Sequence, residues 1–313
     1  MLKQGIYSIE RVILHINDRP SNVTSTVRLF ADDCLIYRPI RSEQDSLALQ
    51  HDLCSLYSWA NTWGMHFNVK KCNILRISRS QTPITRIYTL GGQPLDQVDK
   101  AKYLGITISD ELDWSPHTDL VSSKANNTLA FLRRNLRSCP QSLRELAYIS
   151  LVRSQLEYAA ATWDPHLVGN AQKIERIQRR AARFVCNDYS YYSSVTAMIS
   201  TLGWTDLASR RRDLRLTLFY KVVFGLLAVP TEDTLIRADS RTRASHSHKF
   251  RTIRAKTEAY RQSFFPRTIP DWNQLPPSIV EAPSIDSFKA RLNPSAAPSS
   301  RCAVSLGLAD SCN

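Results

Sequence analysis

Apolar and polar residues follow two different periods along the chain, and the period changes near residue 110. Before this point, short apolar runs are separated by polar residues and glycines, which is typical of β-strands. Beyond Ser115, apolar residues recur every three or four positions, which predicts helices over 116–136, 141–162, 168–187 and 205–228. The pattern therefore predicts an α+β chain, with a small antiparallel β region followed by an α-helical bundle.

The segment from Val27 to Tyr37 places two adjacent aspartates between two short β-prone runs. This arrangement predicts a hairpin in which Asp32 and Asp33 form a two-residue turn. Hard divalent cations such as Mg²⁺ take oxygen ligands, often one or two carboxylates, so an acidic hairpin tip suits a metal site. Aspartate is also common in turns, which gives a purely structural alternative.

The rest of the β region contains one helix and several strands. Ser42 is expected to cap a helix that runs to about Asn61. A strand is expected over 67–78, and two strands over 84–108, joined through Gly91-Gly92, where glycine permits positive φ.

The helix predicted near 169–187 carries an apolar row and a basic row side by side. Ile174, Ile177, Ala181 and Phe184 form the apolar row, and the basic residues precede them by one position each: Lys173, Arg176, Arg180 and Arg183. The basic row can follow a phosphate backbone. Its structural alternative is a solvated helix face with local salt bridges.

The region 231–293 is expected to be basic and rich in loops, with aromatic residues among the cations: Phe250, Tyr260, Phe264 and Phe265. Such aromatics can stack on nucleic-acid bases, or they can attach the loops to the helices. The Ser/Ala/Pro-rich residues 294–313 are expected to be a disordered tail.

Composition favours an anionic partner. Among 313 residues, 41 Lys and Arg against 28 Asp and Glu give a formal charge of +13. This charge suits nucleic acid or an anionic membrane, but no apolar run reaches the roughly 18 residues of a membrane span. The seven scattered cysteines lack zinc-site spacing, and no signal peptide is apparent. We therefore expect an intracellular protein, nuclear or cytoplasmic, that is not secreted and has no membrane partner.

Four motifs then point to a family. Phe30-Ala31-Asp32-Asp33 resembles the catalytic hairpin of reverse transcriptases, in the form used by LINE-type, jockey-like non-LTR retrotransposons. Three further segments resemble motifs that occur in the same order in this family. These are residues 14–20, residues 63–72, and residues 103–108 followed by 112–117. The resemblance extends over 12–292. It implies a partial palm with a catalytic hairpin and primer-grip-like strands in 1–110, a thumb-like helical region in 111–230 and a C-terminal region in 231–293.

The resemblance also implies roles for individual residues. Asp32 and Asp33 would bind Mg²⁺, and Lys71 would lie near the departing pyrophosphate of the dNTP. The trio Tyr103, Leu104 and Gly105 would approach the primer backbone. The implied partners are an RNA template and a DNA primer, or an RNA–DNA hybrid. Structurally, Lys71 could equally be an exposed strand lysine and the trio could end a hairpin.

Two features of the family are not found in this sequence. A polymerase of this family has a third carboxylate on an earlier palm strand and a template-positioning motif, whereas residues 1–11 contain only Glu10 as an acid. A two-metal site cannot hold both ions without its principal ligands. We therefore expect a C-terminal fragment of an RNA-directed DNA polymerase that is inactive alone. The alternative is a non-catalytic remnant that binds nucleic acid through a basic helical thumb.

Overall fold

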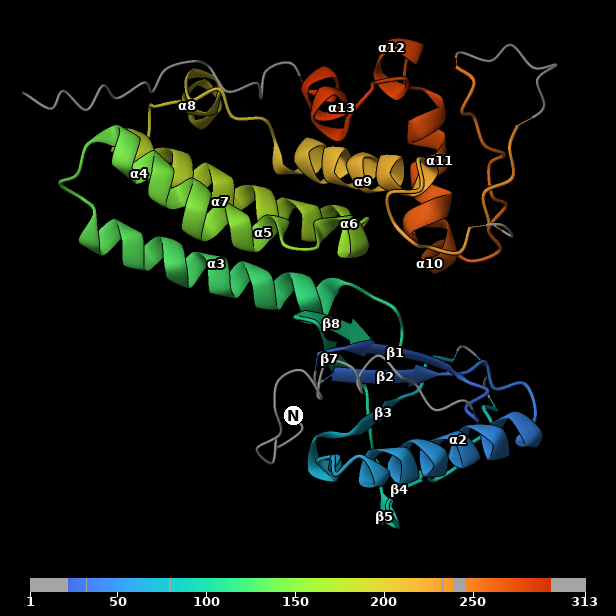
Figure 1. Ribbon diagram of the computed structural model, residues 1–313. Helices are drawn as coiled ribbons and strands as arrows, with labels where there is room; N and C mark the ends of the chain where they lie inside the picture. The colour runs from blue at the N-terminus through green and yellow to red at the C-terminus, as the bar shows by residue number, and fades with distance from the viewer. Residues whose placement is uncertain are drawn as a thin grey trace, which may run out of the picture. The chain divides into compact units, whose positions relative to one another are not determined.

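The computed structural model describes residues 22–31, 33–78, 80, 82–231, 234–238 and 246–293 (Figure 1). The chain divides into two compact units, Met1–His117 and Thr118–Asn313. The region 231–293 thus falls in the second of these units. The expected tail, 294–313, lies outside the described residues.

The described part of the first unit contains one long helix and four pairs of short strands. Three pairs are antiparallel: β1 (Thr26–Phe30) with β2 (Asp33–Tyr37), β4 (Thr89–Leu90) with β5 (Gln93–Pro94), and β7 (Lys100–Tyr103) with β8 (Ile106–Ser109). The fourth pair, β3 (Asn73–Leu75) with β6 (Asp96–Val98), is parallel. The prediction of a continuous strand over 67–78 was wrong, because a 3₁₀ turn, η1 (Val69–Lys71), precedes a three-residue strand.

Helix α2 (Glu43–Thr62) begins where the sequence predicts. The Ser42 hydroxyl accepts from the Asp45 backbone N–H, and the Asp45 carboxylate accepts from the Ser42 N–H, which completes a capping box. The helix buries Leu53 against Tyr88 and Leu90. This small core joins α2 to the β4–β5 hairpin.

Two hairpins of the first unit turn in two residues with positive φ. Gly91 and Gly92 have φ of +59° and +78°, and they join β4 to β5 as predicted. Leu104 and Gly105 have φ of 46° and 82° and join β7 to β8. Positive φ at both central residues matches the right-handed twist of a two-residue hairpin. The prediction of only two strands over 84–108 therefore missed the second hairpin.

The second unit is helical. Its helices up to residue 223 are α3 (Ser115–Asn135, beginning in the first unit), α4 (Gln141–Ala147), α5 (Ser154–Glu157), α6 (Ala160–Trp163), α7 (Val168–Cys186), α8 (Val195–Thr201) and α9 (Leu207–Val223). The predicted helix 141–162 is interrupted: a π-helical segment, η2 (Tyr148–Arg153), links α4 to α5, and Ala159 takes φ 49° before α6. Helix α8 was not predicted.

Four short helices follow α9 in the region expected to be rich in loops: α10 (Glu258–Arg261), α11 (Phe264–Asn273), α12 (Pro277–Val280) and α13 (Ile285–Leu292). The loop-rich expectation was therefore wrong for 258–292. The ring centroids of Phe219 on α9 and Trp272 on α11 lie 5.1 Å apart, and Phe250, Phe264 and Phe265 also pack around Phe219. For these three phenylalanines, attachment to the helices is confirmed.

A buried ionic cluster joins α9 and α11 to the segment after α6. Asp164 accepts from Arg211 Nε at 2.8 Å and from Arg215 Nη1 at 2.5 Å, and Arg267 Nη2 lies 3.0 Å from the same carboxylate. Arg215 also bonds Asp271 at 2.5 Å. A long arginine side chain can bury its stem while its guanidinium pairs with a carboxylate.

Among the described helices, none is long and apolar enough to span a membrane.

Candidate active site and nucleic-acid interface

The β1–β2 hairpin carries the candidate catalytic carboxylates, but its register differs from the prediction by one residue. Phe30 pairs with Asp33, so Asp33 is the first residue of β2 and does not lie in the turn. Ala31, with φ 50°, is part of the two-residue connection. Asp33 is exposed, and its neighbour Phe30 is 62% exposed. Asp32 lies outside the described residues.

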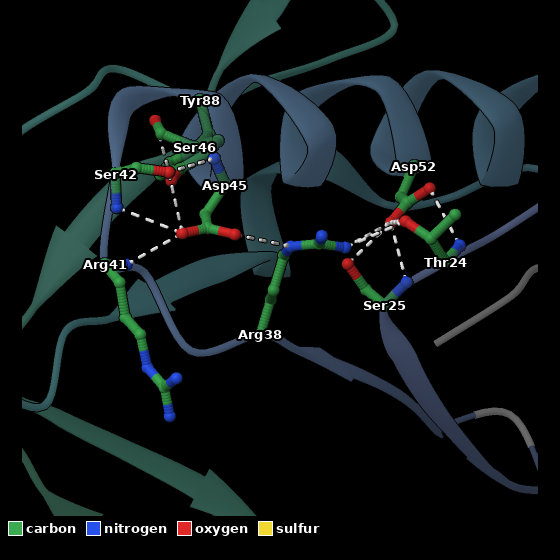
Figure 2. Close-up of polar contacts among 9 residues, drawn as sticks. All are labelled: Thr24, Ser25, Arg38, Arg41, Ser42, Asp45, Ser46, Asp52 and Tyr88. Carbon is green, nitrogen blue, oxygen red and sulfur yellow. Dashed lines mark hydrogen bonds and ion pairs between the residues drawn. The ribbon is translucent and has the colours of Figure 1, made fainter.

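The base of this hairpin is attached to α2 through Asp52, a buried carboxylate with no role in the sequence prediction (Figure 2). Its Oδ1 accepts from the Thr24 N–H at 3.1 Å, and its Oδ2 accepts from the Ser25 N–H at 2.8 Å. The hydroxyls of Ser25 and Thr24 also donate to Oδ2, at 2.5 and 3.1 Å. Burial alone would raise the pKa of Asp52, but these hydrogen bonds outweigh it and lower the pKa.

Arg38 connects the other end of the hairpin to the same helix. Its guanidinium lies 3.8 Å from the Asp52 carboxylate and 3.7 Å from that of Asp45, and it donates to Thr24 Oγ1 at 2.8 Å. Arg38 directly follows β2 and Thr24 precedes β1. Both ends of the hairpin are thus held against one face of α2 (Figure 2), which fixes the strand that presents Asp33.

Tyr103, from the predicted primer-grip segment, lies near the hairpin. Burial raises the pKa of Tyr103, and the charge of Asp33 raises it further, which shows that the two side chains share one electrostatic environment. The pairing Tyr103↔Ile106 leaves Leu104 and Gly105 as the turn of the β7–β8 hairpin. The structural alternative for this trio, that it ends a hairpin, is therefore confirmed, and its contact with a primer stays a prediction.

His117, in the first turns of α3, anchors this second hairpin. Its Nδ1 accepts from the Thr107 backbone N–H of β8 at 3.2 Å. Because burial lowers the pKa of His117, the neutral imidazole that can accept this hydrogen bond is favoured. This hydrogen bond links strand β8 directly to helix α3.

Lys71 is exposed at the end of η1, a 3₁₀ turn and not the predicted strand. The next residue, Cys72, interacts electrostatically with Cys34 on β2, next to Asp33. Burial and this interaction raise the pKa of Cys34 to about 11, so its thiol is protonated at neutral pH and acts as a packing group. The segment that carries Lys71 therefore passes close to the β1–β2 hairpin.

The donor chemistry of the hairpin suits a hard divalent cation, because Asp33 offers an exposed carboxylate. One carboxylate is not a metal site. The part of the chain that the structure describes contains no group of three His, Cys, Asp or Glu side chains placed to hold a metal ion.

The basic row of α7 is largely used within the protein. Lys173 bonds Asp119 of α3 at 2.5 Å, Arg180 bonds Asn126 of α3 at 2.9 Å, and Arg183 bonds three backbone carbonyls after α7. Arg176 is exposed, and no hydrogen bond or ion pair joins its side chain to another described residue. The structural alternative of local contacts thus applies to three of the four residues, and phosphate binding by the row stays a prediction.

Comparison with known proteins identifies relatives for more than half of the chain. Residues 6–108 match the family model "Reverse transcriptase (RNA-dependent DNA polymerase)". The chain is 29% identical over 174 residues to the "Probable RNA-directed DNA polymerase from transposon BS" of Drosophila melanogaster, covering 54% of this chain and 19% of that protein. It is 25% identical over 166 residues to the corresponding protein "from transposon X-element", covering 51% of this chain and 18% of that protein.

These matches cover more of the chain than residues 6–108 can account for, so the similarity continues into the helical unit. The chain covers less than a fifth of the length of each relative. No solved structure matches it significantly.

Proposed function

We propose that the chain is the C-terminal part of a transposon RNA-directed DNA polymerase of the LINE type, jockey-like, and that it does not synthesise DNA alone. Residues 6–108 match the reverse transcriptase family, which supports this proposal. The observation that carries the proposal is the hairpin β1–β2, which bears the family motif at its connection and is attached at both ends to α2. The matches to two transposon polymerases support the same assignment.

In the proposed polymerase, Asp32 and Asp33 would hold Mg²⁺ together with a third carboxylate from an earlier palm strand. Bound Mg²⁺ would neutralise the phosphates of the dNTP and activate the primer hydroxyl. What the chain itself contributes is a fixed scaffold. Asp52 and Arg38 hold the hairpin base, so Asp33 starts a strand whose position does not depend on the ligand.

Two other segments have proposed roles at this site. Lys71, on the turn that passes near β2, supplies a positive charge toward the pyrophosphate as it departs. Tyr103 and the tight Leu104-Gly105 turn face the primer end near Asp33. The proposed substrates are dNTPs, and the proposed partners are an RNA template with a DNA primer or their hybrid.

A second candidate function is nucleic-acid binding without catalysis, through the helical unit, which we compare to a polymerase thumb. The formal charge of +13 supports it. This function needs no complete metal site, so it is open to the chain even where the polymerase is not assembled. An intracellular location, nuclear or cytoplasmic, follows for either function, because template and substrate occur there.

A primed-template assay tests the polymerase proposal. The isolated chain is incubated with Mg²⁺, dNTPs and a DNA primer on an RNA template, and incorporation is measured beside an established reverse transcriptase. We expect no incorporation above background. Mg²⁺-dependent incorporation that Asp32→Ala abolishes would show that the chain carries a complete catalytic site.

A further inference from the structure

Arginines and tyrosines gather on a surface of the second unit that the proposed polymerase site does not use. Arg133 and Arg134 lie in the last turn of α3, and Arg137 follows just after it. Together with Asn187 and Tyr189, which follow α7, these arginines line a pocket of about 780 Å³. We call Arg133, Arg134, Arg137, Tyr189, Tyr191 and Tyr192 the arginine–tyrosine surface.

The three arginines of this surface have no anionic partner among the residues that the structure describes. All three are exposed, and none forms a hydrogen bond or ion pair with another described residue. The guanidinium carbon of Arg133 lies 5.1 Å from the ring centroid of Tyr189, a cation–π arrangement that keeps the cation at the pocket. The helix dipole stabilises cations near a helix C-terminus, which accounts for the positions of Arg133 and Arg134. It does not account for Arg137 or for the exposed tyrosines.

The tyrosines stand on a short connection, residues 188–193, between α7 and α8. Tyr191 and Tyr192 are 93% and 95% exposed, and Tyr189 is 50% exposed. The rings of Tyr191 and Tyr192 meet edge to face, with centroids 5.8 Å apart and planes at 86°. Their ring faces are therefore exposed to water and do not contribute to the hydrophobic core. They are free to stack on the bases of a ligand.

This exposure occurs on a connection that is held in place. Arg183 Nη1 donates to the Ser190 carbonyl at 2.9 Å, and Nη2 donates to the Ser193 carbonyl at 3.4 Å. The Asp188 carboxylate accepts from the Ser190 N–H at 2.9 Å. A connection fixed before binding loses less conformational entropy when a ligand arrives. Arg183 thus supports the surface and is not free to bind phosphate itself.

We propose that the arginine–tyrosine surface binds single-stranded nucleic acid, with phosphates at Arg133, Arg134 and Arg137 and bases stacked on Tyr191 and Tyr192. Cations take the backbone and aromatic faces take the bases. Single strands fit because the bases of a duplex are already stacked on one another and cannot reach an aromatic side chain. The proposal rests on the proposed nucleic-acid function, and it adds the site and the preferred strand form.

Fluorescence anisotropy with the full chain tests stacking. The probes are labelled oligo(U) RNA and oligo(dT) DNA of about twelve nucleotides, within the usual range of single-strand sites, and a duplex of equal length. For Tyr191→Ala/Tyr192→Ala, we expect single-strand affinity to fall roughly tenfold or more, with an unchanged salt slope. Tyr158→Ala, at an exposed tyrosine directly after α5, is the control and is expected to bind like the wild type.

The arginines are tested by salt dependence, because each phosphate contact on a single strand contributes about 0.7 to the slope of log affinity against log salt concentration. Arg134→Ala/Arg137→Ala should weaken binding and reduce the magnitude of the slope by about 1.4. Arg251→Ala/Arg254→Ala removes the same charge from exposed positions after the β-bridge residue Phe250, and it should change the slope less.

The outcomes separate the two proposals. If the RNA probe, the DNA probe or both lose affinity with the tyrosine variant and the duplex does not, the surface is supported and its ligand is identified. Wild-type affinity of the tyrosine variant, or an equal loss for the duplex, overturns the surface while nucleic-acid binding by the chain stands. A chain that binds none of the probes overturns both. Circular dichroism confirms that each variant is folded.

Discussion

Asp52 shows how one buried carboxylate can position the candidate catalytic hairpin. Each of its two oxygens accepts a backbone N–H, from Thr24 on one side and Ser25 on the other. In Asp52→Asn, the NH₂ group of the amide replaces one of the two oxygens in either orientation. One of the two backbone N–H groups then loses its acceptor. We expect the free energy of unfolding of the first unit to fall by about 1–3 kcal/mol, the cost of an unsatisfied buried donor. Chemical denaturation followed by circular dichroism measures it.

Asp96→Asn is the matched control, because Asp96 is exposed on β6 and its side chain makes no hydrogen bond with a described residue. We expect it to change stability by less than about 0.5 kcal/mol. Equal effects of the two substitutions would show that Asp52 does not hold the hairpin.

The same carboxylate predicts a difference in acid stability. Its pKa in the folded chain is below the ordinary value of 3.8. The ionised form therefore stabilises the fold above about pH 3.8, and this contribution is lost as the pH falls through the folded pKa. We expect the stability gap between the wild type and Asp52→Asn to narrow on acidification below this pH. A gap that stays constant down to acid unfolding would contradict the role of the charge.

At the scale of elements, the β4–β5 turn offers a matched pair of glycines. Both Gly91 and Gly92 have positive φ, so alanine at either position costs about 1–2 kcal/mol in backbone strain. A Cβ on Gly91 would lie 2.5 Å from the Tyr57 ring, whereas a Cβ on Gly92 meets no atom within 4 Å. We expect Gly91→Ala to destabilise the first unit more than Gly92→Ala in thermal denaturation. The reverse order would contradict the packing of the turn on α2.

The Asp164 cluster predicts a large effect in the second unit. The side chain of Asp164 is 7% exposed and pairs with arginines from α9 and α11. Removing one partner of a buried ion pair leaves uncompensated charge, so Asp164→Asn should cost about 3–5 kcal/mol. Asp119→Asn breaks a pair that is 42% and 58% exposed, and it should cost less than about 1 kcal/mol. Urea denaturation followed by helical circular dichroism compares the two, and similar losses would refute the cluster's importance.

Local signals in the sequence predicted local structure well. The helix cap at Ser42, the apolar row of α7 and the glycine pair at 91–92 each depend on neighbouring residues, and the structure contains all three. The sequence could not show that β3 pairs with β6 more than twenty residues away, because three-residue strands carry no period. Helices α10 and α12, with four residues each, are similarly too short to give a helical pattern.

A sequence motif made part of the candidate site predictable. The features that depend on pairing between distant residues could not be predicted. The motif identified the hairpin, but the register that places Asp33 in β2 follows from the backbone pairing. The basic row of α7 was visible in the sequence. Its partners, Asp119 and Asn126, lie 54 positions away on α3, so nothing in the local pattern showed that two of its cations are already engaged.

At the scale of the whole molecule, the chain combines a segment that matches the reverse transcriptase family with a helical unit to which the similarity to transposon polymerases extends. The chain has a formal net charge of +13, and some of its arginines are buried in the Asp164 cluster. The exposed cations that remain, among them Arg133, Arg134 and Arg137, are available to phosphates. Both proposed functions depend on cations that are exposed and not engaged in ion pairs within the protein.

The measurement that tests the central claim most directly is Mg²⁺-dependent dNTP incorporation by the chain joined in frame behind the preceding palm segment of a transposon reverse transcriptase. With the third carboxylate supplied, we predict synthesis on a primed RNA template. Asp32→Asn and Asp33→Asn should each reduce it strongly, whereas Asp96→Asn should not. A joined protein that synthesises DNA equally well with both hairpin aspartates replaced would contradict the claim that this hairpin is the catalytic element.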